Sequence, residues 1–266
     1  MSGTVEVKRQ GAVACVTLRH PGKLNAMSRA MWQALRSVFE SIQRSTDVRC
    51  VLIRGEGGHF CAGGDIAEYP AFRFDESSLR DFHENDVWGG LQAMLDCDVP
   101  IVAQIEGNCM GAGVEVACCC DIRIAAESAR FGAPIARLGF PMAPREAALV
   151  LREAGVLTAR EMLLQAAVLS AAEMKARGFL NQVVADAAIT NAALASARHV
   201  AALAPQAARL NKQTLRALNR AIAHMGYSLS ATDYVANEVR DAYCYADSAE
   251  HREGIAAFMQ KRKPVF

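Results

Sequence analysis

A single carboxylate, Glu115, stands in an otherwise apolar segment directly after a turn of small residues, 111–113. The apolar residues 101–105 predict a strand that leads into this turn, and residues 114–120 predict a buried helix that leaves it. A helix N-terminus carries unpaired N–H groups and a partial positive charge, so it stabilises a nearby anion. The segment predicts a base beside an anion-binding turn, although an ordinary first-turn glutamate fits it equally well.

The length of 266 residues suits one large domain, or one domain with a helical appendage. A net charge of +1 and an apolar fraction of 52% give no support to a nucleic-acid partner, including RNA binding as a side role. The first residues hold no apolar signal core, and no run approaches the about 18 apolar residues of a membrane span. We therefore expect a cytoplasmic or organelle-matrix protein with no membrane partner.

The nine cysteines lack the spacing of a disulfide framework. Cys118, Cys119 and Cys120 lie in the apolar segment, where a free thiol packs like a small hydrophobic side chain. Because the sequence has no Cys-x-x-Cys pair, we expect no zinc site and no other metal. We predict reduced cysteines with structural roles.

Strand and helix patterns alternate in the first half of the chain. We expect a hairpin of residues 5–8 and 13–18, a helix capped by Ser28, and buried strands at residues 50–53, 101–105 and 122–125. Residues 69–85 are polar and irregular, which favours a mobile substrate loop.

The second half of the chain is mostly helical from residue 144 onward. Alanine-rich helices are expected near residues 145–154, 158–166, 171–177 and 187–203, with a last strand at residues 181–184. The tail, residues 205–266, reads as three helices. Because the composition changes near residue 200, we expect a mixed region at residues 1–200 and a helical region at residues 201–266.

Two loops of small residues each follow a predicted strand, at residues 62–65 and 111–113. Small side chains let a ligand approach the backbone, whose N–H groups then act as donors, and two such loops could form one oxyanion hole. Nucleotide-binding motifs do not fit, because residues 55–65 contain neither Gly-Lys-Ser/Thr nor Gly-x-Gly-x-x-Gly. The chain also lacks Gly-x-Ser-x-Gly and His-Glu-x-x-His.

Several segments resemble, in chain order, the signatures of the enoyl-CoA hydratase/isomerase (crotonase) superfamily. They are His20-Pro21, Leu-Asn-Ala at residues 24–26, Phe-Cys-Ala-Gly-Gly-Asp-Ile at residues 60–66, residues 99–132, and residues 253–263. The resemblance covers essentially the whole chain. It implies an α/β fold, with a spiral of β-β-α repeats at residues 1–200 and a C-terminal helical oligomerisation region at residues 201–266 that forms a homotrimer or a dimer of trimers.

The resemblance also implies a chemistry. Members of the superfamily bind acyl-CoA thioesters, in which coenzyme A is part of the substrate rather than a permanent cofactor, and stabilise an enolate at the thioester carbonyl. By matching position, the oxyanion donors are the backbone N–H groups of Gly64 and Ala112. Glycine is usual where Ala112 stands, but the exchange keeps the N–H. Glu115 matches the first of the two catalytic glutamates of the hydratases.

The second catalytic glutamate is absent. Hydratases of the superfamily carry it in a Phe-Gly-x-Pro-Glu segment, which here ends in Ile135. Adding water to a conjugated thioester needs a base for the water and an acid for the α-carbon, and losing a positioned acid or base costs about 10²–10⁴-fold in rate. Standard hydration therefore requires Glu115 to do both jobs.

Other polar residues are candidates for the missing role. Glu146 and Arg145 follow Pro144 at a predicted helix start, where the helix dipole favours an acidic residue, so we expect structural roles. Glu68 and Tyr69 follow the first loop and could line the acyl pocket. Structural or surface roles are expected for His20, His59, His83 and Asp121.

The resemblance further implies contacts with the substrate and its coenzyme. Lys23 lies one position from the basic residue that contacts the pyrophosphate, and residues 62–66 would line the adenine and pantetheine path. Phe258 and Lys261 match positions that contact coenzyme A, often from a neighbouring subunit, although a core aromatic and a solvated lysine fit equally well. The expected contacts are Lys23, Leu24, Ala62, Asp65, Ile66, Ile135, Phe258 and Lys261.

The sequence thus predicts a lyase or isomerase of the enoyl-CoA hydratase/isomerase type that stabilises a thioester enolate and uses Glu115 as its single acid/base. The alternatives are an acyl-CoA decarboxylase or double-bond isomerase, which need fewer positioned acids, and a catalytically weak acyl-CoA-binding protein. A buried acid is costly to keep without a use, which argues against the binding protein.

Overall fold

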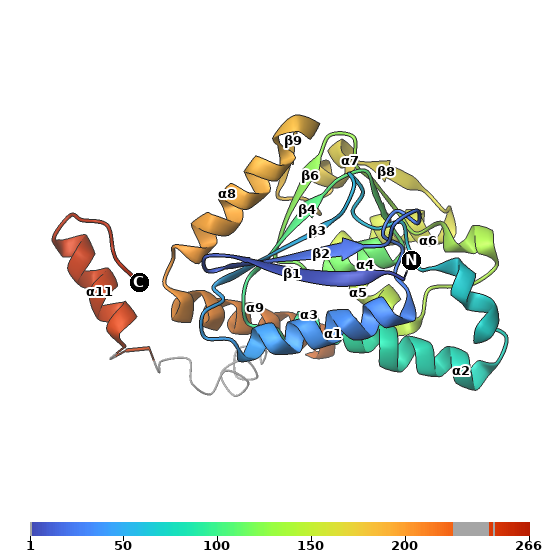
Figure 1. Cartoon of the computed structure of the whole chain (residues 1–266), viewed down its shortest axis with the longest axis horizontal. Helices are drawn as coiled ribbons and strands as arrows, with labels where there is room; N and C mark the ends of the chain where they lie inside the picture. Colours follow the sequence, from blue (N-terminus) through green and yellow to red (C-terminus); the bar gives the residue numbers. More distant parts are fainter. Residues whose placement is uncertain (1, 226–244, 247) are drawn as a thin grey trace.

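A six-stranded sheet forms the centre of the computed structural model, which describes residues 2–225, 245–246 and 248–266. The strand order is β1-β2-β3-β4-β6-β9, in which β1 and β2 pair antiparallel and every later pair is parallel. A second sheet has the order β5-β7-β8. This arrangement confirms the mixed α/β fold predicted from the sequence (Figure 1).

The strands and helices of the described residues alternate along the first part of the chain and are mostly helices in the second. The strands are β1 (Thr4–Gln10), β2 (Val13–Arg19), β3 (Cys50–Gly55), β4 (Ile101–Ile105), β5 (Asn108–Met110), β6 (Ile122–Ala126), β7 (Arg130–Gly132), β8 (Val168–Ser170) and β9 (Gln182–Val184). The α-helices are α1 (Arg29–Arg44), α2 (Glu76–Asp81), α3 (Trp88–Asp96), α4 (Ala112–Cys118), α5 (Pro144–Ala154), α6 (Val156–Leu164), α7 (Ala171–Ala176), α8 (Ile189–Ala201), α9 (Pro205–Met225) and α11 (Ala249–Met259). Short helical turns are η1 (Ile66–Ala71), η2 (Phe82–Val87, a π-helix), η3 (Pro134–Leu138) and η4 (Asp186–Ala188).

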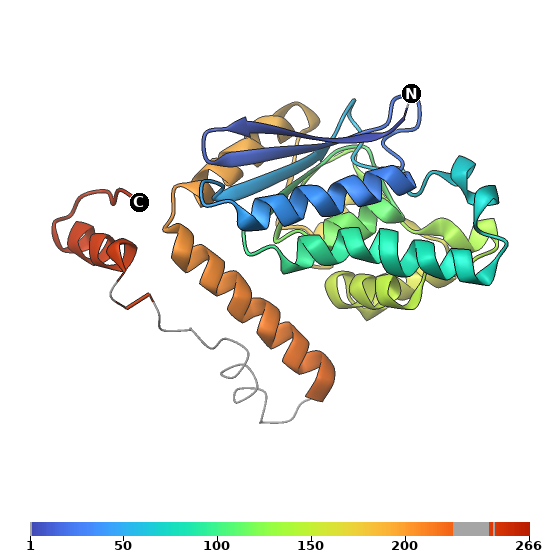
Figure 2. The ribbon, with the colours of Figure 1, turned by 60° about the horizontal axis from the view of Figure 1, so that its bottom comes forward.

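Side-chain alternation along β2 supplies both faces of the large sheet with core residues. Val16 and Leu18 pack with Trp32 of α1 in one buried cluster, whereas Val13 and Cys15 pack with α8 in a second cluster. Neighbouring residues of a strand point to opposite faces, so one strand contributes to both clusters. Figures 1 and 2 show α8 on one side of the sheet and α1 and α3 on the other.

Strand–strand–helix units recur around the centre of the fold. In the unit β4-β5-α4, the first strand joins the large sheet and the second joins the small sheet. The strands β6 and β7 repeat this division, and α5 follows them after η3. Every residue of α4 is buried, as expected for a helix that is apolar on all sides.

Most elements predicted from the sequence are confirmed. Ser28 caps α1, and its hydroxyl accepts a hydrogen bond of 3.2 Å from the backbone N–H of Met31. The expected helices of the second half correspond to α5, α6, α7 and α8, and the last strand is β9. The strands β5, β7 and β8 were not predicted, because three residues are too few to show a period. The helix α4 begins at Ala112, two residues earlier than predicted.

Residues 69–85 correct the sequence prediction of an irregular loop. They form the second half of η1, the helix α2 and part of η2, which runs directly into α3. The carboxylate of Asp75 caps α2 by accepting the N–H of Ser78 at 2.8 Å. The rings of Phe72 and Phe82 are buried against each other with centroids 4.4 Å apart. This packing stabilises helical structure in a segment whose polar composition does not indicate it.

The cysteines of the described residues are all free and buried, in agreement with the predicted structural role. Burial raises the pKa of the Cys61 and Cys120 thiols to about 12. These thiols therefore remain protonated at neutral pH and pack as small apolar groups.

The tail helix α9 is held against the core by basic side chains. Arg209 donates to the carbonyl oxygens of Ser45 and Val48, and Lys212 pairs with Asp121 at 2.7 Å. The helices α9 and α11 account for two of the three predicted tail helices, and residues 226–244 between them lie outside the described part of the chain. Among the described helices, none has the length and the apolar character that crossing a bilayer requires.

Gly113, the second residue of α4, is required by close backbone packing. A Cβ at this position would lie 2.6 Å from the carbonyl oxygen of Cys61. We expect Gly113→Ala to reduce the free energy of unfolding by about 1–3 kcal/mol, because neither backbone can yield without disturbing the other. Denaturant unfolding monitored by circular dichroism would measure the change.

Gly89 provides the matched control, since it is the second residue of α3 and its added Cβ would meet only the flexible Arg36 side chain, at 3.4 Å. There the same exchange is expected to stabilise the helix by up to about 1 kcal/mol. Equal effects of the two variants would contradict the packing argument.

Candidate active site

The two small-residue loops predicted from the sequence lie side by side. The N–H of Cys61 donates to the carbonyl oxygen of Asn108, and the N–H of Met110 donates back to that of Cys61, both at 2.9 Å. Gly63 and Gly111 have φ angles of +114° and +47°, which favour glycine, and a Cβ on Gly111 would lie 3.7 Å from the Cα of Gly63. Segments 48 residues apart in sequence, as Gly63 and Gly111 are, therefore form one backbone surface.

Two backbone N–H groups on this surface are available to a ligand. Within the described part of the chain, the N–H groups of Gly64 and Ala112 have no hydrogen-bond acceptor, although both residues line a cavity. Ala112 is the first residue of α4, where no preceding turn supplies a carbonyl oxygen. The residues on either side are satisfied, since Asp65 donates to Met27 and Gly111 donates to Gly132. The two free donors are those predicted for the oxyanion hole.

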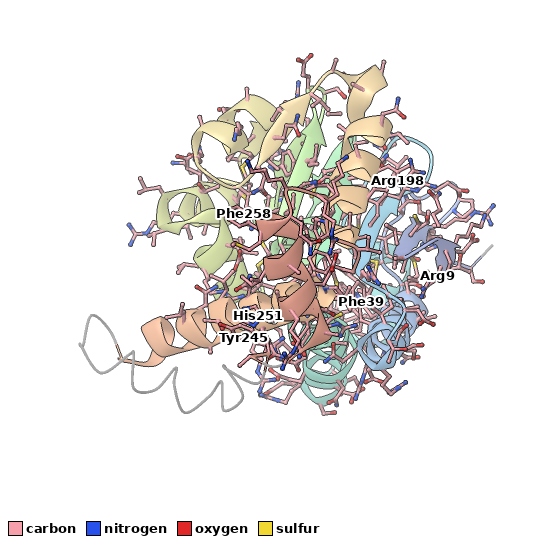
Figure 3. The ribbon with its side chains drawn as sticks, turned by 90° about the vertical axis from the view of Figure 1, so that its left-hand side faces the viewer. Arg9, Phe39, Arg198, Tyr245, His251 and Phe258 are labelled. Carbon is pink, nitrogen blue, oxygen red and sulfur yellow. The ribbon has the colours of Figure 1, made fainter. Side chains whose placement is uncertain are left out.

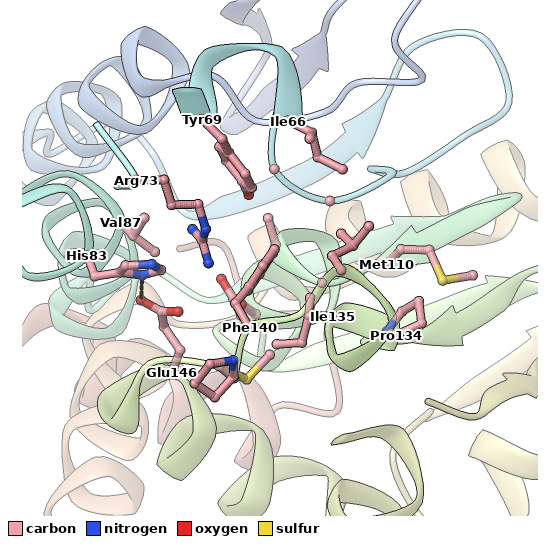
Figure 4. A pocket seen from close by; sticks show the side chains of 18 of the residues that line it. Ile66, Tyr69, Arg73, His83, Val87, Met110, Pro134, Ile135, Phe140 and Glu146 are labelled. Carbon is pink, nitrogen blue, oxygen red and sulfur yellow. Dashed lines mark hydrogen bonds and ion pairs between the residues drawn. The ribbon is translucent and has the colours of Figure 1, made fainter. Parts of the chain in front are cut away.

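The cavity beside these donors has a volume of about 300 Å³ and a mostly apolar wall. Its walls come from the two loops, η1, η2, α4, η3 and the start of α5 (Figure 4). The charged or polar side chains that line it are Tyr69, Arg73, His83, Glu115, Arg137 and Glu146. Ile135 of η3 also lines the cavity. A hydrocarbon side chain therefore occupies the sequence position at which the hydratases carry their second catalytic glutamate.

Glu115 enters the cavity from the first turn of α4 and is only 6% exposed. Burial, and in second place the negative charge of Glu146, raise the pKa of the Glu115 carboxyl well above its usual range. The carboxyl group therefore keeps its proton at a pH at which an exposed glutamate has lost it. A carboxyl group in this state can donate a proton and, once ionised, take one back.

Glu146 lies in the same cavity, although the sequence favoured a structural role for it. Its side chain comes from the first turn of α5, is buried, and hydrogen-bonds the Nδ1 of His83 at 2.8 Å (Figure 4). The neighbouring Arg145 instead pairs with Glu84 at 3.1 Å on the surface. A structural or surface role was expected for His83, and no local pattern in the sequence shows that η2 and α5 meet.

Tyr69 and Glu68 were both candidates for the missing acid, but only Tyr69 lines the cavity. Tyr69 lines the cavity, and a Cβ at Gly64 would lie 2.1 Å from its hydroxyl oxygen. Burial raises the pKa of Tyr69 to about 12, so the hydroxyl remains a donor at neutral pH. Glu68 is not part of the cavity wall, because its carboxylate accepts the backbone N–H of Arg29 at 2.8 Å. Glu68 therefore has a local structural contact.

Five of the expected coenzyme contacts lie on two segments that contact each other, and two of the five line the cavity. Lys23 pairs with the buried Asp65 at 2.6 Å, and Leu24 accepts the N–H of Ala62 at 3.0 Å. Ala62 and the exposed Ile66 also line the cavity. The structure thus brings together residues from two segments that the sequence analysis grouped by resemblance.

Phe258 and Lys261 do not line the cavity within a single chain. Phe258 lies on α11, which Figure 1 shows at the far left and apart from α5, and its ring is 80% exposed. Figure 3 looks onto this helix and labels Phe258. Lys261 follows the end of α11 with a positive φ of 53°. Neither residue lines the cavity of its own subunit.

The remaining candidates have structural contacts, as predicted. The Nδ1 of His59 accepts the N–H of Asn108 at the start of β5, at 3.1 Å. The ring of His20 contacts the carbonyl oxygen of Ala26, and Asp121 accepts the N–H of Ile101. Across the described residues, no cluster of three or more His, Cys, Asp or Glu side chains could hold a metal ion.

Comparison with known proteins identifies the family of the chain. The chain matches the family model of enoyl-CoA hydratase/isomerase over residues 8–266. A crystal structure of an enoyl-CoA hydratase/carnithine racemase from Magnetospirillum magneticum is 35% identical, with a TM-score of 0.89 over 100% of this chain and 96% of that chain.

Two relatives are similar over nearly their whole length. The probable enoyl-CoA hydratase echA8 of Mycobacterium bovis is 30% identical over 263 residues, which are 99% of this chain and 97% of that protein. The 2,3-dehydroadipyl-CoA hydratase of Escherichia coli K12 is 30% identical over 260 residues, or 98% and 97% of the two chains. The chain therefore belongs to the enoyl-CoA hydratase/isomerase family and has the crotonase fold.

Proposed function

We propose that the protein converts an acyl-CoA thioester through an enolate that the N–H groups of Gly64 and Ala112 stabilise, with Glu115 moving the proton at the α-carbon. The observation that carries the proposal is the pair of unsatisfied N–H groups on the wall of a cavity that also holds a buried, protonatable carboxyl group. The thioester oxygen would accept both N–H groups. Each such donor is typically worth about 3–4 kcal/mol in the transition state.

Glu115 acts in this proposal as the single acid/base. Its raised pKa suits a group that must hold a proton, release it and recover it during the reaction. Ile135 supplies neither an acid nor a water ligand, so a shift of the double bond, which one carboxyl group can perform, fits the cavity better than standard hydration. Glu146 is held by His83 and acts through its charge on Glu115.

Two alternatives use the same cavity. An acyl-CoA decarboxylase would need the oxyanion donors and one proton donor, and would release carbon dioxide from a malonyl-type thioester. A catalytically weak binding protein would hold the thioester without forming a product.

A turnover screen with enoyl-, β-hydroxyacyl- and malonyl-type CoA esters distinguishes the three functions. The products are identified by their mass. Failure to bind any CoA thioester in calorimetry would contradict all of them.

The proposal also covers how the protein holds coenzyme A and how its subunits associate. Lys23, Leu24, Ala62, Asp65 and Ile66 would hold the coenzyme A portion at the edge of the cavity. Residues 201–266 would form the trimerisation region, and Phe258 and Lys261 would contact the coenzyme A of a neighbouring subunit. The exposure of Ile255, Phe258 and Met259 on α11 supports this assignment, since such apolar side chains are usually covered by a partner.

Replacing Glu115 by glutamine tests the proton-transfer role. Glu115→Gln keeps the shape of the side chain but removes the exchangeable proton, so turnover should fall about 10²–10⁴-fold. Affinity for a saturated acyl-CoA in calorimetry should stay within about threefold, because the N–H donors are unchanged. Full turnover by this variant on every processed thioester would show that another group moves the proton.

The charge of Glu146 should be visible in the pH dependence of catalysis. Ionised Glu146 opposes the ionisation of Glu115, so Glu146→Gln should lower the pKa of Glu115. If ionised Glu115 is the base, the acidic limb of the pH profile of kcat/KM should then move to lower pH. Most of the activity should remain. His83→Asn is the control, because it loses the ring but keeps the charge of Glu146. Loss of activity by Glu146→Gln without a shift of the limb would instead make Glu146 an acid/base itself.

Restoring the missing carboxylate tests the effect of Ile135. We expect Ile135→Glu to raise the hydration of crotonyl-CoA by about tenfold or more, below the about 10²–10⁴-fold of an evolved acid/base. Ile135→Gln is the matched control, since it adds polarity but no acid. Absorbance of the conjugated thioester follows the reaction, and equal rates for both variants would refute the explanation.

A further inference from the structure

Arg73 places a cation inside the acyl cavity, a residue that the sequence analysis did not select. Its guanidinium carbon lies 3.6 Å from the ring centre of Phe140 and 4.5 Å from that of Tyr69. Figure 4 shows the side chain entering the cavity between these two rings. Stacking on aromatic faces fixes the plane of a guanidinium group, so its N–H donors point in a defined direction.

The Nη1 atom of Arg73 is buried and, within the described part of the chain, has no hydrogen-bond partner. The other arginine of the cavity wall, Arg137, is exposed and donates to the carbonyl oxygen of Ala166 at 3.1 Å. Burial lowers the pKa of the Arg73 guanidinium, which reflects the cost of holding its charge away from water. A buried donor left unpaired costs free energy, and a charged donor costs more than a neutral one.

The carboxylates of the cavity do not satisfy Arg73. Glu146 forms its hydrogen bond with His83, and no ion pair joins Arg73 to any carboxylate of the described residues. Glu115 is held in its neutral form at a pH at which exposed carboxyl groups are ionised. Although the charge of Glu146 acts on Arg73 from a distance, the Nη1 of Arg73 keeps a donor that a carboxylate of a ligand can accept.

We propose that Arg73 binds a carboxylate carried by the acyl group of the CoA thioester, so that the substrates are acyl-CoA esters of dicarboxylic acids. The inference rests on the proposed function, because it assumes that the acyl group occupies this cavity. A planar guanidinium fork matches the two oxygens of a carboxylate. A neutral acyl chain would not form this ion pair, so it would bind less tightly than a carboxylated chain.

The bound carboxylate is a recognition group rather than a leaving group. Loss of carbon dioxide removes the negative charge that Arg73 would hold, so an ion pair with Arg73 would stabilise the ground state more than the transition state. The thioester oxygen has its own donors in Gly64 and Ala112. The carboxylate therefore belongs at the distal end of the acyl chain, away from the reacting carbons.

Calorimetric titration of the full chain with matched pairs of saturated thioesters tests the inference. The pairs are succinyl-CoA with butyryl-CoA, glutaryl-CoA with pentanoyl-CoA, and adipyl-CoA with hexanoyl-CoA. For the chain length that fits, the carboxylated ester should bind about 10–100-fold more tightly. Arg73→Gln should abolish this preference and leave the affinity for the methyl-ended ester within about threefold, which also shows that the cavity is folded.

Arg80→Gln is the matched control, because Arg80 lies in the same segment but pairs with Glu76 on the surface. It removes the same formal charge and should keep the preference. Equal affinities within every pair in the unchanged protein, or an undiminished preference in Arg73→Gln, would overturn the inference. Binding of methyl-ended esters alone would leave the proposed function standing, whereas absence of binding by all six esters would overturn both.

Discussion

The backbone pairing between Cys61 and β5 is the contact on which the site depends. It joins the loop after β3 to the turn before α4, and it places the free N–H groups of Gly64 and Ala112 on one surface. The pairing is possible only with small residues, because a Cβ at Gly113 would collide with the carbonyl oxygen of Cys61. The glycine pattern therefore follows from the distance between two backbones and is required before any ligand binds.

Local patterns in the sequence predicted the frame of the molecule well. Helical spacing and the Ser28 cap identified α1, and apolar runs identified β3, β4 and β6, because these elements satisfy their own periodicity. The loops of small residues were also evident, and Glu115 was selected as the only carboxylate of an apolar segment. These features are encoded within about 15 neighbouring residues, a distance over which periodicity and turn chemistry act.

The remaining part of the cavity wall depends on contacts between distant segments. His83 and Glu146 are 63 residues apart, and neither lies in a pattern that indicates the other. Arg73 and Tyr69 fall in a segment whose polar composition suggested a loop, whereas packing of Phe72 against Phe82 stabilises helices there. Tertiary packing overrides local propensity in this region, so its contribution to the cavity could not be predicted from one sequence.

The apolar wall of the cavity connects the state of Glu115 with the role of Arg73. Burial raises the pKa of the Glu115 carboxyl, and it leaves the Nη1 of Arg73 without a hydrogen-bond partner among the described residues. A carboxylate entering this cavity alone would raise the pKa of Glu115 further, since a like charge disfavours ionisation. An arginine that neutralises the entering carboxylate removes most of this effect. The cavity could then admit an anionic acyl chain while its acid/base still releases a proton in the working pH range.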